Sequence, residues 1–298
     1  MRWSPERAVR PSPGEDSADP VGRRRRLRLR PTGVVGLVVL TALLIGALLA
    51  PWLAPFDPND QDVARRLTPP FQHGSPFLLG TDHVGRDVLS RLIHGARIAW
   101  LIGASAVLLS GTAGVTLGLL TGYYGGLLDD LIGWLVNVEL AFPFILLAVV
   151  VAAALGAGLG KLILVLTVVS WVVYARVVRA ETLVQREQEF VQAARALGSG
   201  NVRILLRHVL PNVFPPVIVI ATFEFSRMII SEASLSFLGL GVRPGVPSWG
   251  SMLADGRQYL ATAWWVATFP GLGITLTVLA INFVGDWLRD QLDPRLDA

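Results

Sequence analysis

EQEFVQAARALGSGNVRILLRHVLPN, residues 187–212, is a polar stretch in the middle of an otherwise apolar sequence. Long apolar segments flank it, LILVLTVVSWVVYA at 162–175 and PPVIVIATF at 215–223. The stretch itself carries three arginines, two adjacent alanines and two glycines. Because its charges would be costly in lipid, the sequence predicts a water-exposed helix inserted between two membrane-spanning segments.

The composition of the whole chain indicates a membrane protein. Of its 298 residues, 52% are apolar and only 16% are charged, whereas soluble domains average about 25% charged residues. The charge-poor parts are uninterrupted apolar runs, which are typical of membrane-spanning helices. The sequence contains no cysteine, which excludes disulfides, thiol nucleophiles and cysteine-based metal sites.

Charge-free stretches predict an all-α membrane protein with six transmembrane helices, because about 20 apolar residues cross a bilayer. The second stretch is longer than one crossing needs and is expected to end in a loop at GYYGG. The expected spans are residues 31–56, 98–128, 131–155, 162–178, 215–235 and one span within 258–285.

The basic run GRRRRLRLR at 22–30 predicts a cytoplasmic N-terminus. Six spans then return the C-terminus to the same side and place the stretch 187–212 in the cytoplasm. The six arginines between Arg176 and Arg207 agree with this placement, whereas five arginines in the first loop, expected outside, oppose it. We give more weight to the N-terminal run because it is denser and because the first helix usually sets the topology.

Within the polar stretch, four apolar residues fall on one helix face at i, i+3, i+4 and i+7, namely Phe190, Ala193, Ala194 and Leu197. The alanines let another backbone approach this face closely. Gly198 follows at a position suited to a left-handed C-cap, and Pro211 is expected to mark the start of the next helix. Such a helix either packs on its own protein or docks on a cytoplasmic partner.

The stretch also resembles a known motif. QAARALG, followed after nine residues by HVLPN, is similar to the cytoplasmic coupling motif of ABC-importer permeases, usually written E-A-A-x3-G-x9-I-x-L-P. The matching positions are Ala193, Ala194, Gly198, Leu210 and Pro211. Gln192 stands where glutamate is usual, and His208 stands where isoleucine is usual.

Four other segments resemble the dipeptide/oligopeptide/nickel permease family, and more closely its second (C-type) permease subunit. They are LGTDHVGRDVLSRLIHGAR at 79–97, SEASLSFLGLG at 231–241, PSWGSMLADGR at 247–257 and DWLRDQLDPRL at 286–296. The resemblance covers nearly all of residues 33–296. It implies an all-α type I ABC-importer permease (MetI-like) fold with six transmembrane helices and a cytoplasmic coupling helix.

The resemblance further implies four regions along the chain. These are a cytoplasmic arginine-rich tail, an anchor helix with an extracytoplasmic loop, the type-1 transmembrane permease domain and a cytoplasmic C-terminal tail, at residues 1–30, 31–93, 94–288 and 289–298. The expected location is the bacterial plasma (inner) membrane, with several crossings and both termini in the cytoplasm.

A permease of this family forms half of an ATP-driven import pathway, so the resemblance implies uptake of di- or oligopeptides, with nickel chelates or another small solute as alternatives. The expected partners are a homologous second permease, two cytoplasmic ABC ATPases, an extracytoplasmic solute-binding protein and membrane lipid, with no nucleic acid. Closure of the ATPases on ATP would move the coupling helices. The residues to which the resemblance assigns this coupling are Phe190, Gln192, Ala193, Ala194, Leu197, Gly198 and Pro211.

The chain is expected to be no enzyme and to hold no metal or cofactor, with ATP and magnesium bound by the partner ATPases. The sequence that comes nearest to a phosphate-binding loop is LGAGLGKL at 155–162. There Leu155 and Leu162 replace the first glycine and the Ser/Thr of G-x4-G-K-[ST]. A passive channel, which needs no ATPase, and an intramembrane enzyme are the rival classes, and neither explains the alanine-bearing cytoplasmic helix.

Ionisable residues inside spans are the candidates for the translocation pathway, because charges facing lipid are costly. They are Glu139 in the third span and Glu224, Arg227 and Glu232 in or near the fifth. Glu224 and Arg227 are spaced i, i+3, so they either neutralise each other or bind the charged termini of a peptide. Glu232 is expected near the outer mouth.

Two further patterns leave alternatives open. Gly114, Gly118 and Gly122 in the second span allow close helix packing, either within the chain or against a partner permease. The segment around GTDHVGRD predicts an interfacial helix that leads into the second span and is capped by Thr81 or Asp82. Its conspicuous motif would suit either partner contact or gating.

Overall fold

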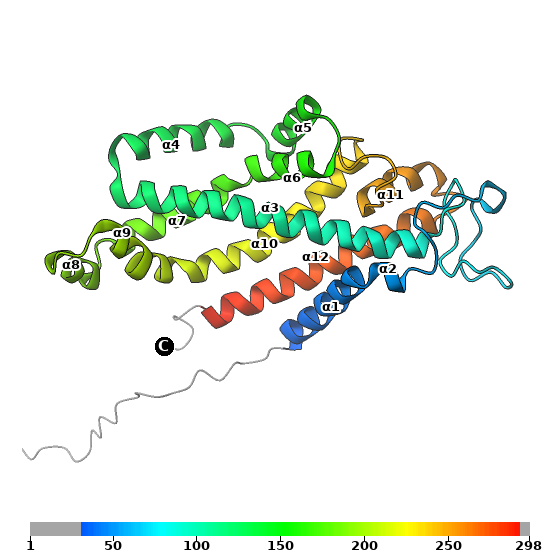
Figure 1. The fold of residues 1–298 in the computed structure, drawn as a ribbon, viewed down its shortest axis with the longest axis horizontal. Helices are drawn as coiled ribbons and strands as arrows, with labels where there is room; N and C mark the ends of the chain where they lie inside the picture. Colours follow the sequence, from blue (N-terminus) through cyan, green and yellow to red (C-terminus); the bar gives the residue numbers. More distant parts are fainter. Residues whose placement is uncertain (1–30, 293–298) are drawn as a thin grey trace, which may run out of the picture.

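The computed structural model describes residues 31–292, which fold into helices connected by turns and by one long loop before α3 (Figure 1). Within this range there is no β-strand beyond a bridge between Thr81 and Asp87. The arginine-rich tail at 1–30 and the last six residues lie outside it. The helices are α1 (Pro31–Leu48), α2 (Ala50–Leu53), α3 (Val88–Tyr124), α4 (Gly126–Leu140), α5 (Phe144–Leu155), α6 (Leu159–Val168), α7 (Trp171–Gln185), α8 (Glu189–Ala196), α9 (Asn201–Ile204), α10 (Leu210–Phe237), α11 (Trp249–Gly256) and α12 (Trp265–Leu292).

The described residues contain five helical segments that are long and apolar enough to cross a membrane. They are Pro31–Leu48, Val88–Tyr124, Leu159–Gln185, Asn201–Phe237 and Trp265–Leu292. The pair α4 and α5 passes the same test jointly but is bent by 94°. Counted as one span, this pair completes the six spans that the sequence predicts.

The third predicted span, 131–155, is therefore not one helix but two. The break falls between α4 and α5, immediately before Phe144. Pro143 lacks an amide hydrogen and disfavours helical geometry in the residue before it, which favours an interruption of the helix at this point. Hydropathy alone missed the break because Ala141, Phe142 and Pro143 carry no charge.

Helix α3 merges two elements that the sequence predicts separately. Its 37 residues include the second half of the expected interfacial helix and most of the second span. At about 1.5 Å per residue it is far longer than a bilayer core. The cap is Asp87, whose side chain accepts a hydrogen bond from the Ser90 amide at 2.8 Å, so the expected cap at Thr81 or Asp82 was wrong. The helix ends at Gly125, inside the predicted GYYGG loop.

The helical run at Asn201–Phe237 also begins earlier than predicted. Pro211 does not start a new helix after a break. Instead, α9 passes into α10 through a π-helical turn, Leu205–Val209. A π-helical turn accommodates a local disruption of the α-helical hydrogen-bond ladder, and Pro211 disrupts that ladder because it cannot donate a backbone hydrogen bond.

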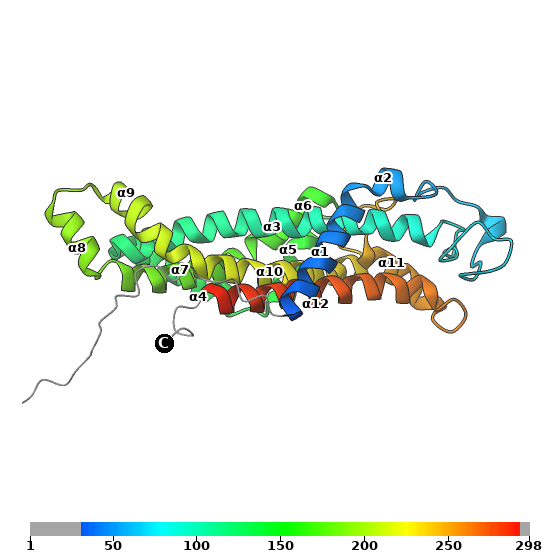
Figure 2. The ribbon, with the colours of Figure 1, turned by 90° about the horizontal axis from the view of Figure 1, so that it is seen from below.

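The long helices α3, α10 and α12 run side by side along the molecule (Figures 1 and 2). Helix α1 lies against α12, where Gly33 packs on Trp287 and Gly36 on the backbone of Ala280. The start of α1 thus lies against the end of α12. The first and the last described residues are therefore on the same side of the molecule (Figure 1).

The most extensive contact between two described helices joins α3 to α7, and it depends on glycine. Gly114, Gly118 and Gly122 all face α7, which shows that this glycine row packs within the chain. A Cβ atom at Gly118 would lie 2.7 Å from the carbonyl oxygen of Ala175 and 2.8 Å from Cβ of Val178. Since these neighbours are backbone and a β-branched side chain, neither can move aside easily.

We expect Gly118→Ala to destabilise the protein by about 1–3 kcal/mol, because it overpacks the contact between α3 and α7. Thermal unfolding of the detergent-solubilised protein measures this change. Gly133→Ala is the matched control, since a Cβ there would meet nothing within 4 Å and alanine favours the helix by about 1 kcal/mol. Equal unfolding temperatures for the two variants would contradict the packing role.

Candidate functional site

Helix α8 ends in the left-handed cap that its sequence predicts. Gly198 has a φ of +78°. The Ser199 amide donates to the carbonyl of Ala194 at 3.0 Å, and the Gly198 amide donates to the carbonyl of Arg195 at 3.0 Å. This pair of bonds is a Schellman motif, which favours glycine because other residues are strained at positive φ.

The two sides of α8 are differently packed. Val191 and Ala194 are buried against the core of the same chain. Phe190 and Ala193 are exposed, and Leu197 is 86% exposed. The face predicted from spacing is therefore split, because Ala194 turns inward to join Val191. The outward residues Phe190, Ala193 and Leu197 form what we call the docking face.

Contacts from α3 hold α8 and the start of α9 in place. Arg186, just before α8, donates to the carbonyl of Gly122 at 2.9 Å. The Tyr123 hydroxyl donates to the side-chain oxygen of Asn201 at 3.1 Å. The guanidinium of Arg195 lies 5.7 Å from the centre of the Tyr123 ring, within the range of a cation–π interaction. The docking face is thus presented by a fixed element.

Glu224 and Arg227 on α10 form the ion pair that their spacing suggests. Nη1 of Arg227 lies 3.0 Å from Oε1 of Glu224. The guanidinium of Arg227 also lies over the ring of Phe144, 3.8 Å from its centre, at the start of α5. Not every polar atom here has a partner, since Oε2 of Glu224 and the Tyr174 hydroxyl are buried without a hydrogen bond among the described residues. The Arg227 side chain remains 35% exposed.

Glu139 joins this cluster from the end of α4. Its Oε2 accepts a hydrogen bond from Nε1 of Trp171 on α7 at 2.9 Å, and Arg227 interacts with it electrostatically. The structure therefore brings together three of the four predicted pathway residues, at the break between α4 and α5. We call Glu139, Glu224 and Arg227 the membrane cluster.

Glu232 lies apart from the membrane cluster. It is 1% exposed, and its Oε1 accepts a hydrogen bond from the Ser236 hydroxyl at 2.7 Å. The turn of α10 that contains Glu232 faces α11, because Gly250 on α11 packs against Ala233 and Ser236. Glu232 is therefore buried where α10 packs against α11. Its role in the translocation pathway stays a prediction.

One ion pair between spans was missed in the sequence. Asp129 on α4 and Arg179 on α7 form a bidentate pair, with distances of 2.5 Å from Nε to Oδ1 and 2.6 Å from Nη2 to Oδ2. This pair ties the bent segment to α7. The two residues are 50 positions apart, so no helical spacing relates them. Each lies just outside a predicted span, and the sequence alone gives no sign that they pair.

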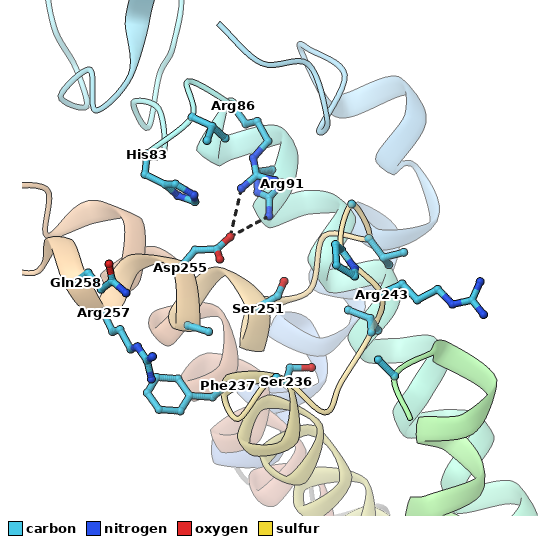
Figure 3. A pocket seen from close by; sticks show the side chains of 18 of the residues that line it. His83, Arg86, Arg91, Ser236, Phe237, Arg243, Ser251, Asp255, Arg257 and Gln258 are labelled. Carbon is cyan, nitrogen blue, oxygen red and sulfur yellow. Dashed lines mark hydrogen bonds and ion pairs between the residues drawn. The ribbon is translucent and has the colours of Figure 1, made fainter. Parts of the chain in front are cut away.

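The GTDHVGRD motif builds an ionic network at the end of the molecule opposite α8 (Figures 1 and 3). Asp82 accepts hydrogen bonds from the amides of Val84 and Arg86 and from Nε of Arg86, the last at 2.6 Å. Arg86 and Arg91 both reach Asp255 on α11, at 3.2 and 3.9 Å. The motif therefore fastens the start of α3 to α11.

The residues described hold no group of three or more His, Asp or Glu side chains that could bind a metal ion. The phosphate-loop lookalike forms the turn between α5 and α6. There the ammonium of Lys161 donates to the carbonyl of Leu155 at 2.6 Å. Lys161 thus stabilises the end of α5, which is a local structural role.

Sequence comparison matches two families to the chain. The family described as the binding-protein-dependent transport system inner membrane component matches residues 114–298. The N-terminal transmembrane domain of oligopeptide transport permease C matches residues 23–70. Among solved structures, the MetNI methionine ABC transporter is similar, with a TM-score of 0.54 and 22% identity over 68% of this chain and 96% of that chain. That likeness supports the type I permease fold.

Two curated relatives are similar over most of their length. The di/tripeptide transport system permease protein DppC of Pseudomonas aeruginosa is 48% identical over 264 residues, 88% of this chain and 87% of that protein. The dipeptide transport system permease protein DppC of Escherichia coli K12 is 48% identical over 266 residues, 88% of this chain and 89% of that protein. These matches confirm the resemblance seen in the motifs, and the chain belongs to the family of inner membrane components of binding-protein-dependent transport systems.

Proposed function

We propose that this permease imports di- or oligopeptides and couples their passage to ATP hydrolysis by cytoplasmic partner subunits. The observation that carries the proposal is the docking face of α8, where Leu197 is 86% exposed, Ala193 is exposed and Phe190 is 42% exposed beside the ring of His208. Exposed apolar groups on a polar element at the end of a membrane protein indicate a protein partner. The peptide substrate is supported by the names of the two DppC relatives.

The α8 segment would transmit the motion of the ATPases. In this proposal α8 lies in the cytoplasm, in a groove of an ABC ATPase, and ATP-driven closure of two ATPases draws the coupling helices together. A homologous second permease supplies the other half of the pathway, and a solute-binding protein delivers peptide at the opposite end. This orientation puts both termini and α8 on the cytoplasmic side, in agreement with the basic N-terminal run.

The membrane cluster would line the pathway. Glu139 and Arg227 lie in segments predicted to cross the membrane, yet both are partly exposed on the single chain. Charged side chains at such depth face water or another protein rather than lipid. The break beside them supports the same assignment, because non-helical backbone at membrane depth is tolerated where it is buried in protein or lines a cavity.

We expect Leu197→Asp to weaken binding of the ATPase by tenfold or more, because it removes about 1.5–3 kcal/mol of apolar burial and places a carboxylate in the contact. Membrane insertion should be normal, since the side chain is 86% exposed in the free chain. Copurification of the ATPase and peptide uptake by proteoliposomes are the measurements. Val63→Asp is the control, with a side chain 65% exposed in the loop before α3, at the end of the molecule opposite α8, and it should leave both unchanged.

Gly198→Glu should abolish ATP-driven uptake while the protein still inserts. Its φ of +78° strains any side chain by about 1–2 kcal/mol, and the glutamate would lie beside the docking face. Gly198→Asn should retain most uptake, because asparagine tolerates the left-handed conformation. Uptake at the wild-type rate in the glutamate variant would show that α8 is not the coupling element.

The absence of cysteine allows single-cysteine labelling of the proposed pathway. We expect Glu139→Cys, in the assembled importer, to react with a membrane-impermeant thiosulfonate, because the thiolate forms only where water is present. Leu276→Cys on α12, in a charge-free stretch, should not react although Leu276 is 51% exposed on the single chain. If Glu139→Cys is protected like Leu276→Cys, the membrane cluster does not line the pathway.

A further inference from the structure

A pocket of about 750 Å³ lies beside the ionic network, at the end of the molecule opposite α8 (Figure 3). Its walls come from the loop before α3, from the end of α10 with the loop after it, and from α11. Nothing in the coupling mechanism uses this pocket. Its volume lies within the range of about 300–1,000 Å³ that is typical of sites for small molecules.

The pocket is strongly basic. Four arginines line it, Arg86, Arg91, Arg243 and Arg257, whereas Asp255 is the one acidic residue in the lining. Asp82 lies behind the wall and neutralises part of this charge through ion pairs with both Arg86 and Arg91. A concave site with this balance attracts anions and concentrates the electrostatic field inside it.

Arg91 has donors left over. Its side chain is only 4% exposed, yet among the described residues it donates one hydrogen bond, from Nη1 to the carbonyl of Pro58 at 3.3 Å. Its distances to the carboxylates of Asp82 and Asp255 are 3.7 and 3.9 Å, which are ion-pair rather than hydrogen-bond distances. A guanidinium has five N–H donors, and buried donors are normally satisfied.

Asp255 shows what chemistry this pair of arginines accepts. Its Oδ2 lies between Arg86 and Arg91 (Figure 3), and its side chain is 38% exposed. A carboxylate therefore already occupies the position between the two guanidinium groups, but it is held at only one hydrogen-bonding distance, 3.2 Å from Nη2 of Arg86. A carboxylate placed deeper could bind both arginines.

We propose that this pocket binds the C-terminal carboxylate of a peptide, and that Arg86 and Arg91 hold it in competition with Asp255. The two arginines are recessed, with side chains 11% and 4% exposed, so a small molecule or an extended chain end fits the pocket better than a protein surface does. Arg257 and Arg243 at the wall add attraction. This assignment rests on the proposed peptide function and on α8 being cytoplasmic, which puts the pocket outside.

The test is equilibrium binding of alanyl-alanine to the assembled importer in nanodiscs, without ATP and without the solute-binding protein. The wild type should bind alanyl-alanine at least about tenfold more tightly than alanyl-alanine amide, because only the free acid forms charge-assisted hydrogen bonds. Asp255→Asn should tighten binding of the acid several-fold and leave the amide unchanged. A gain of affinity of this kind cannot come from misfolding.

Arg257→Gln should weaken binding of the acid, since it removes one positive charge from the pocket wall. Arg66→Gln is the matched control, because Arg66 is an exposed arginine in the loop before α3 and outside the lining. Equal affinities for the acid and the amide, or no response to Asp255→Asn, would overturn the proposal. In a separate assay with the solute-binding protein added, variants that changed only the affinity for that protein would also overturn the proposal, since the pocket would then bind a protein.

Uptake assays separate this inference from the proposed function. If the wild type imports alanyl-alanine with ATP but shows no preference for the free acid in the binding assay, the pocket assignment alone is wrong. If it imports no peptide in the presence of its partners, the peptide function itself is wrong.

Discussion

Backbone hydrogen bonding in lipid is the constraint on which the rest of this structure depends. A peptide group without a partner inside a bilayer costs several kcal/mol, so the chain crosses as helices wherever lipid surrounds it. Interruptions of the helices are therefore informative. They include the break before Phe144, beside the membrane cluster, the break between α6 and α7, and the π-helical turn that leads into α10. The π-helical turn lies along the chain between α8 and the charged residues of α10.

The same constraint connects α8 to the charged residues of α10 through one long helical run. From Asn201 to Phe237 the backbone is one helical run, with α8 packed against its first turns and Glu224 and Arg227 on its second half. In the proposed coupling, a displacement of α8 would reach the membrane cluster through this helical run rather than through a loop. Helix α3, which packs closely on α7 at Gly118, also lies against this run.

The sequence was informative where one residue type decides a local conformation. The apolar runs predicted the spans, and Gly198 predicted the cap of α8. The resemblance of the motifs gave the family. Features that depend on distant partners were not predictable: the turn of Ala194 toward the core, the pairing of Asp129 with Arg179 and the approach of Asp255 to Arg91. The break at Pro143 could have been anticipated from backbone chemistry, but hydropathy concealed it. The GTDHVGRD motif was noticed, but only the coordinates show that it fastens α3 to α11.

The π-helical turn at Leu205–Val209 has an angular consequence. Each residue in an α-helix advances the side-chain direction by about 100°, and a π-helical turn absorbs an additional residue without shifting the neighbouring turns by that angle. The azimuth of α8 relative to α10 is thus fixed by the number of residues between them as much as by their chemistry. In homologous chains, a one-residue insertion or deletion that is not absorbed in this way would rotate α8 about the axis of α10 by about 100°, even if every side chain of the docking face were kept.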